Sequence, residues 1–238
     1  MSADEIISYL KSISSLKYKN NVIRMGIPEE SCIGVSTGDL RKMATKLGKS
    51  NELAWELWHT GYHEAKILAV LLMKKKETSK ADIDTMMKDV HSWDLCDHIC
   101  KNLIIKLPEY KDFIWEWRDN DGTYYRRAVF TLIASVSVHE KNINKDEIDE
   151  YFGLIRSYAD DNSEYVRKAI SWALRELGKI DFDYVERAIE VAYELIESPS
   201  KNCRWIGKDA LKELETLVKV EGRSRLISSS SAMGRGQF

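Results

Sequence analysis

Apolar residues recur along most of the chain at every third or fourth position, the spacing that places them on one face of an α-helix. We find no convincing alternation of apolar and polar residues of the kind that marks a half-buried strand. The helical pattern covers residues 3–15, 16–25, 36–47, 51–60, 62–76, 80–89, 93–106, 109–118, 123–138, 146–159, 163–179, 181–197 and 199–218. The pattern therefore predicts an all-α fold.

The predicted helices resemble one another at intervals near 40 residues. The stretch "EYVRKAISWALREL" resembles "TYYRRAVFTLIA". Aligning the two makes Lys168 equivalent to Arg127, which lies 41 residues earlier in the chain. Two helices recurring at this interval are typical of HEAT and armadillo-type repeats, which stack into a solenoid with a concave face. We expect a single repeat domain over residues 1–220 and a flexible C-terminal tail over residues 221–238.

Composition narrows the class of protein only a little. The 238 residues are 44% hydrophobic and 31% charged, and the net charge of −2 gives no support to nucleic-acid binding by itself. The four cysteines form no CxxC pair, which favours a reducing compartment. The longest apolar run, Ile67–Met73, is too short for a bilayer. We expect a cytoplasmic protein, nucleoid-associated or nuclear if eukaryotic, without a membrane partner.

The stretch "HSWDLCDHIC", residues 91–100, combines residue types that serve in metal or catalytic sites. On a helix, the side chains that share the core face are Leu95, Cys96, Ile99, Cys100 and Leu103. Trp93 and Asp97 lie one turn apart at the margin of that face. We interpret the cysteines as core residues, because a zinc site with His91 matches no familiar ligand spacing. Ser92 and Asp94 fit the start of a helix.

Trp172 is more than a quarter-turn away from the apolar face of its predicted helix. Lys168 and Arg175 are its neighbours on either side along the helix. One interpretation buries this ring against the next repeat, and the other makes it an aromatic platform in a basic groove.

Arg127 points away from the apolar face of the helix that begins at Thr123. Alone it would be a solvated arginine, but equivalent positions in a repeat array share one surface. The cations that could form a strip on that surface are Arg126, Arg127, Arg167, Lys168, Arg175 and Lys179. A strip of this kind follows a phosphate backbone.

The motifs "SWDLCD", "YYRRAVFTLIA" and "EYVRKAISWALRELGK", in this order and spacing, resemble the AlkD-like DNA alkylation repair family. The likeness spans about residues 20–215 and is specific as a combination. It implies a HEAT-like solenoid that cradles duplex DNA, and active members are glycosylases for N3- and N7-alkylated purines. It also implies that they act without base flipping.

The resemblance implies a role for particular residues. Asp97 matches the catalytic aspartate, and Trp93 and Trp172 match the two tryptophans of the active site. Arg127 and Arg175 match cations beside the DNA backbone, and Lys168 and Arg126 join them as candidate DNA-binding residues. We expect a monomeric base excision repair enzyme that needs no metal or other cofactor.

The chemistry suits these residue types. A cationic alkylpurine leaves as a neutral base, so that no general acid is needed, and positive charge develops on the sugar. A carboxylate and tryptophan faces stabilise that charge. Two alternatives remain open: a catalytically silent DNA-binding relative, and a protein-interaction scaffold. The scaffold is disfavoured because a cationic groove with isolated tryptophans is not typical of a protein-binding surface.

Overall fold

The computed structural model describes residues 1–140 and 143–237, and helices make up most of it. The helices are α1 (Ala3–Ser12), α2 (Leu16–Arg24), α3 (Thr37–Leu47), α4 (Asn51–His59), α5 (His63–Leu72), α6 (Lys80–Lys88), α7 (Trp93–Asn102), α8 (Tyr110–Trp117), α9 (Thr123–His139), α10 (Lys145–Tyr158), α11 (Glu164–Gly178), α12 (Phe182–Glu197) and α13 (Lys201–Leu214). Short 3-10 turns are η1 (Glu29–Ser31), η2 (Lys75–Glu77), η3 (Ile104–Lys106) and η4 (Gly234–Gln237). The all-α fold expected from the sequence is confirmed.

Most helix boundaries agree with the sequence pattern, and the differences are shifts of a few residues. The backbone turns extended at Met73 (ψ 140°), so α5 ends four residues before the predicted position. Ser36 caps α3, and its hydroxyl accepts the Asp39 N–H at 3.1 Å. Gly48 ends the same helix, and its φ of 76° suits a glycine.

The chain forms two compact units, residues 1–111 and residues 112–238. In the first unit α5 is packed against α3, α4 and α7. α5 itself is buried from His63 to Leu72, apart from Lys66. This central helix therefore positions α7, which carries the candidate catalytic residues.

Glu64, at the start of α5, is buried and fastens the preceding loop. Its carboxylate accepts the backbone N–H groups of Ile33 and Gly34 at 2.9 and 2.6 Å. Gly34 has a φ of 99°, and a Cβ there would lie 2.7 Å from the Ser15 carbonyl oxygen. The loop between η1 and α3 is thus tied to the core helix of the unit.

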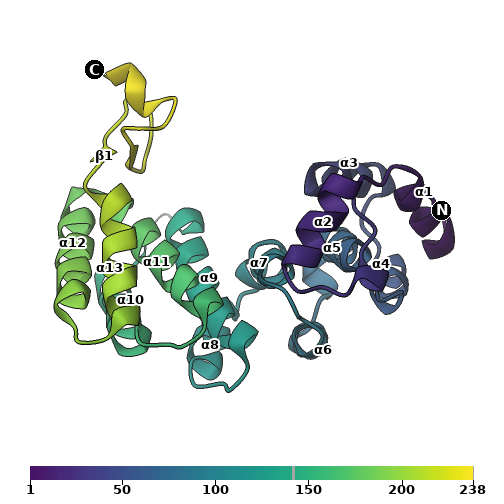
Figure 1. The fold of residues 1–238 in the computed structure, drawn as a ribbon, viewed down its shortest axis with the longest axis horizontal. Helices are drawn as coiled ribbons and strands as arrows, with labels where there is room; N and C mark the ends of the chain where they lie inside the picture. The colour runs from purple at the N-terminus through teal and green to yellow at the C-terminus, as the bar shows by residue number, and fades with distance from the viewer. Residues whose placement is uncertain (141–142, 238) are drawn as a thin grey trace. The chain divides into compact units, whose positions relative to one another are not determined.

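In the second unit α9, α11 and α13 lie side by side in that order, with α10 and α12 packed against them (Figure 1). α9 is buried along a continuous run from Arg127 to Ser137. A helix enclosed in this way has no exposed polar face over that run.

Arginine side chains mark the repeat in this unit. Arg126, Arg167 and Arg204 each stand near the start of an inner helix and donate from Nη1 to carbonyl oxygens of the loop before it. Arg126 Nε also donates to Asp161 at 2.7 Å, and Arg167 Nη1 donates to Asn202 at 2.8 Å. In both cases the side-chain partner lies 35 residues further along the chain, which agrees with the recurrence expected from the sequence.

The last segment folds back onto the second unit. Strand β1 (Leu217–Val218) pairs antiparallel with β2 (Ile227–Ser228). Leu226 is 1% exposed, and its N–H donates to the Lys179 carbonyl at 2.9 Å. Phe238 lies outside the described residues. Flexibility from residue 221 onward stays a prediction, as does the division of the chain at residue 220.

Candidate functional site

Asp97 and Trp93 stand one helical turn apart on α7, in the first unit. Asp97 is 7% exposed, whereas the Trp93 ring is 38% exposed. Lys101, exposed one turn beyond Asp97, continues the same row. The arrangement places a carboxylate that is largely removed from water one helical turn from a partly exposed tryptophan.

A hydrogen-bonded contact between His63 and Asp94 holds the start of α7 against α5. His63, which is 3% exposed, places Nε2 2.9 Å from Asp94 Oδ2, and the Leu95 N–H donates to the other carboxylate oxygen at 2.9 Å. Burial works to raise the pKa of Asp94, but the hydrogen bonds and charge of His63 outweigh it and hold this pKa below its usual range. Ser92 occupies the N-cap position without the side-chain capping bond expected of it.

His98 follows Asp97 and is neutral at physiological pH. Burial, together with the charges of Arg41 and Lys101, lowers the pKa of His98 to about 4, against the opposing effect of Asp94 and Asp97. Its Nδ1 lies 3.2 Å from the Asn102 amide nitrogen, which assigns Nδ1 as acceptor and leaves the proton on Nε2.

The cysteines of α7 belong to the core, as the sequence indicates. Cys96 and Cys100 are both 0% exposed. Among residues 1–140 and 143–237, no group of three or more His, Cys, Asp or Glu side chains is placed to hold a metal ion.

Trp172 lies outside the core face of α11, in the second unit, and is half-buried. Its Nε1–H donates to Glu176 Oε1 at 3.3 Å, an oxygen that also accepts Lys179 Nζ at 2.9 Å. The other Glu176 oxygen accepts Arg225 Nη2 at 2.8 Å. A carboxylate therefore connects the indole of Trp172 to the C-terminal segment.

The basic strip expected on the second unit is compensated by acidic partners. Arg175 Nη1 lies 2.9 Å from Glu213, and Lys168 Nζ lies 2.6 Å from Glu164. Arg126 makes the repeat bonds described above, which are those of a structural residue. A phosphate that binds this surface has to compete with these partners, and DNA contact by these cations stays a prediction.

Arg127 differs from its expected placement. The helix-face arithmetic directs it to solvent, but the side chain is 6% exposed and donates to the Tyr165 carbonyl at 2.7 Å. The expectation of an outward arginine is wrong because α9 is enclosed on that side as well. Its role as a phosphate contact stays a prediction.

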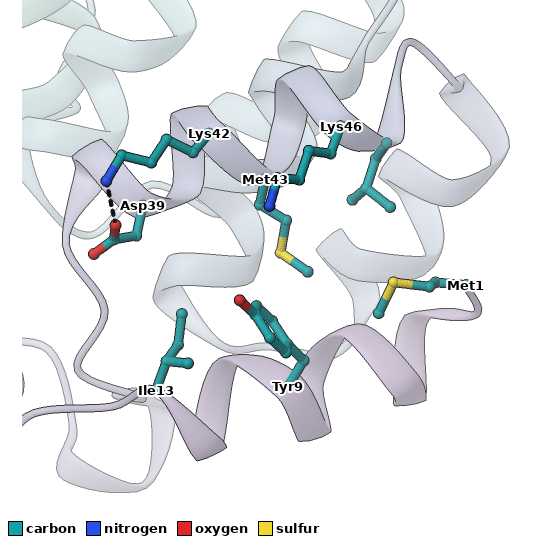
Figure 2. A pocket seen from close by; sticks show the side chains of 8 residues that line it. Met1, Tyr9, Ile13, Asp39, Lys42, Met43 and Lys46 are labelled. Atoms are coloured by element: carbon teal, nitrogen blue, oxygen red, sulfur yellow. Dashed lines mark hydrogen bonds and ion pairs between the residues drawn. The ribbon is translucent and has the colours of Figure 1, made fainter.

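A separate hollow of about 310 Å³ lies between α1 and α3. Figure 2 shows Tyr9 of α1, and Ile13 directly after this helix, facing Met43 of α3, with Lys42 paired to Asp39 at one edge. The residues expected in the active site and at the DNA backbone are not among those that line it.

Comparison with known proteins identifies the family. The family model described as "DNA alkylation repair enzyme" matches residues 6–214, and the chain belongs to this family. No curated protein matches the chain. Within the described part of the chain, no helix combines the length and the apolar character that a bilayer crossing needs.

One solved structure supports a HEAT-like repeat fold. One described as "a new family of proteins related to the HEAT-like repeat DNA glycosylases with affinity for branched DNA structures" has a TM-score of 0.74 at 18% identity, over 100% of this chain and 94% of its own. A designed armadillo repeat protein in complex with the peptide (KR)4 has a TM-score of 0.35 at 15% identity, over 73% of this chain and 90% of its own.

Proposed function

We propose that the protein is a DNA glycosylase that hydrolyses the N-glycosidic bond of cationic N3- and N7-alkylated purines in duplex DNA. The observation that carries the proposal is Asp97, a carboxylate that is 7% exposed and stands one helical turn from Trp93, a tryptophan that is 38% exposed. It occurs in a chain of the DNA alkylation repair enzyme family.

The reaction follows from the charge of the substrate. When the bond between C1′ and the base nitrogen breaks, its electron pair moves to the base and neutralises the cation. The sugar becomes an oxocarbenium-like cation, which an ionised Asp97 stabilises electrostatically. Water adds to C1′, and Asp97 accepts its proton as a general base. The products are the free alkylpurine and an abasic sugar.

The remaining predicted residues receive supporting roles in the proposal. Trp93, and Trp172 in the second unit, offer aromatic faces to a cationic sugar or base, an attraction of about 1–2 kcal/mol each when water is excluded. Arg175 and Lys168 would exchange their carboxylate partners for DNA phosphates, whereas Arg126 and Arg127 have fewer outward donors.

A second candidate function is DNA binding without base excision. It is favoured by the fold likeness to a protein described as having affinity for branched DNA structures. At 18% identity that likeness concerns the fold, so the two candidates have to be separated by chemistry.

Release of 7-methylguanine and 3-methyladenine from methylated duplex DNA tests the proposal. We expect release in the presence of EDTA, because the proposed mechanism uses no metal, and no release from unmethylated DNA. Binding of branched and linear duplexes is measured in parallel. Tight binding without any base release would support the second candidate and contradict the first.

A further inference from the structure

Lysines gather where three helices of the first unit, α3, α5 and α7, end. Lys49 follows the end of α3, Lys74–Lys76 follow α5, and Lys106 closes η3 after α7. α3 is packed on α5 and α5 on α7, and these lysines line one common hollow, so the three ends are neighbours. We call Lys49, Lys74, Lys75, Lys76 and Lys106 the lysine rim.

Hydrogen bonds hold the first two parts of the lysine rim together. The Ser50 N–H donates to the Leu72 carbonyl at 3.0 Å, and the Lys74 N–H donates to Asn51 Oδ1 at 2.8 Å. Lys49 Nζ donates to the Leu71 carbonyl at 2.8 Å. The spacing of these lysines is therefore set by backbone contacts.

The rim borders two hollows. One of about 500 Å³ is lined by all five rim lysines together with Met73, Glu77 and Asn102. The other, of about 460 Å³, shares Lys75, Lys76 and Lys106 and adds Glu109. Five ammonium groups thus face two carboxylates, a local excess of three positive charges on a chain whose net charge is −2.

Acidic partners are not available to every cation of the rim in the described part of the chain. Lys74 pairs with Glu77 at 3.1 Å. Within residues 1–140 and 143–237, neither Lys75 nor Lys76 has a hydrogen-bond or ion-pair partner. Partial burial and the charge of Lys75 hold the pKa of Lys49 below its usual range.

Interaction with helix dipoles accounts for only part of this cluster. A cation in the last turn of a helix is stabilised by the carbonyl groups there, and Lys49 makes such a bond. Lys75 and Lys76 lie beyond the end of α5 and make none. Uncompensated charges held on the edge of a hollow attract anions.

The lysine rim differs from the proposed active site. Asn102, which lines the larger hollow, is nine residues from Trp93 on α7, about 180° around the helix axis. It is about 140° from Asp97 by the same geometry. The rim and the Trp93 ring therefore face different sides of α7.

We propose that the lysine rim is a second DNA contact, which binds the phosphate backbone outside the excision site. The inference rests on the proposed function in taking duplex DNA as the partner. Several lysines spread over two hollows suit a repeating anion better than a single phosphate group.

Charge reversal tests the proposal with a control in the same unit. The variant K75E/K76E is compared with K42E/K46E, which changes the same charge at two exposed lysines of α3. We expect K75E/K76E to weaken binding of a 30-base-pair undamaged duplex about tenfold or more at low salt. Its salt slope of log K should fall by about two, with the melting temperature unchanged.

Equal affinity and salt slope for K75E/K76E and K42E/K46E would overturn the proposal. So would normal duplex binding combined with lost binding to phosphatidylserine vesicles, because the rim would then serve a lipid surface. Excision at saturating DNA should stay unchanged in K75E/K76E. If the wild-type protein binds duplex through the rim but releases no base, the proposed function fails and the second contact stands.

Discussion

Arg225 and Glu176 form a partly buried ion pair that ties the C-terminal segment to α11. Arg225 Nη2 lies 2.8 Å from Glu176 Oε2 and donates to the Glu176 carbonyl at 2.7 Å. The same carboxylate accepts the Trp172 N–H. A residue in the expected tail therefore acts on the ring proposed for the active site through one intervening side chain.

Arg225→Ala should lower both stability and excision. Loss of a partner from a pair whose side chains are 19% and 14% exposed costs about 2–3 kcal/mol of unfolding free energy. Glu176 is then free to turn from Trp172, so we expect excision at saturating DNA to fall several-fold at a temperature where the variant is folded. Urea denaturation and single-turnover kinetics measure the two effects.

Arg223→Ala is the matched control, because Arg223 is exposed and lies in the same segment. It should change neither quantity, and Arg225→Lys should recover part of both. Excision by Arg225→Ala equal to that of Arg223→Ala would show that Glu176 holds Trp172 without Arg225.

The pKa of His98 predicts a loss of stability in mild acid. The folded pKa of about 4 lies below the unfolded value of 6.5, so the unfolded chain binds the proton first. The His98 contribution is therefore fully present above pH 6.5 and is lost as the pH falls toward 4. We expect unfolding free energy to drop by about 2–3 kcal/mol over this window.

His98→Gln should flatten that part of the pH profile, measured by urea denaturation at a series of pH values. Asp94 does not interfere with this test. Its pKa is lowered, so its contribution to the unfolding free energy is lost only in stronger acid. A profile for His98→Gln that is parallel to wild type between pH 6.5 and 4 is incompatible with a neutral, buried His98.

The cysteines of α7 should matter for stability alone. Cys96→Ala leaves a small cavity, and Cys100→Ser places a hydroxyl in an apolar site, each costing about 1–3 kcal/mol. We expect lower melting temperatures and unchanged excision in the folded variants. Stoichiometric zinc in the wild-type protein, lost with either substitution, would instead make these residues metal ligands.

Much of the fold follows from the sequence because helices with one buried face leave a clear period. The apolar face of α7 comes from that period alone, whereas the repeat relation between Arg127 and Lys168 comes from the likeness of two stretches 41 residues apart. The same arithmetic fails at Arg127, since it assumes that burial is one-sided and α9 is enclosed over eleven residues. The family resemblance, rather than periodicity, supplied the role of Asp97.

Interactions between distant positions were beyond sequence reasoning. The partners of Arg126 and Arg175 lie 35 and 38 residues away, so their compensation is invisible along the chain. The lysine rim had a visible sign, the run "KKK" directly after a buried helix. Its neighbours Lys49 and Lys106 become adjacent only when the helix ends meet.

Single-turnover release of 7-methylguanine by Asp97→Asn tests the central claim most directly. The substitution keeps the shape of the side chain and removes its charge, so we expect the melting temperature and duplex affinity to stay close to wild type. The excision rate should fall by a factor of about 10²–10³, the usual cost of losing one electrostatic stabiliser of the transition state. A rate within a few-fold of wild type would show that Asp97 is not the catalytic carboxylate.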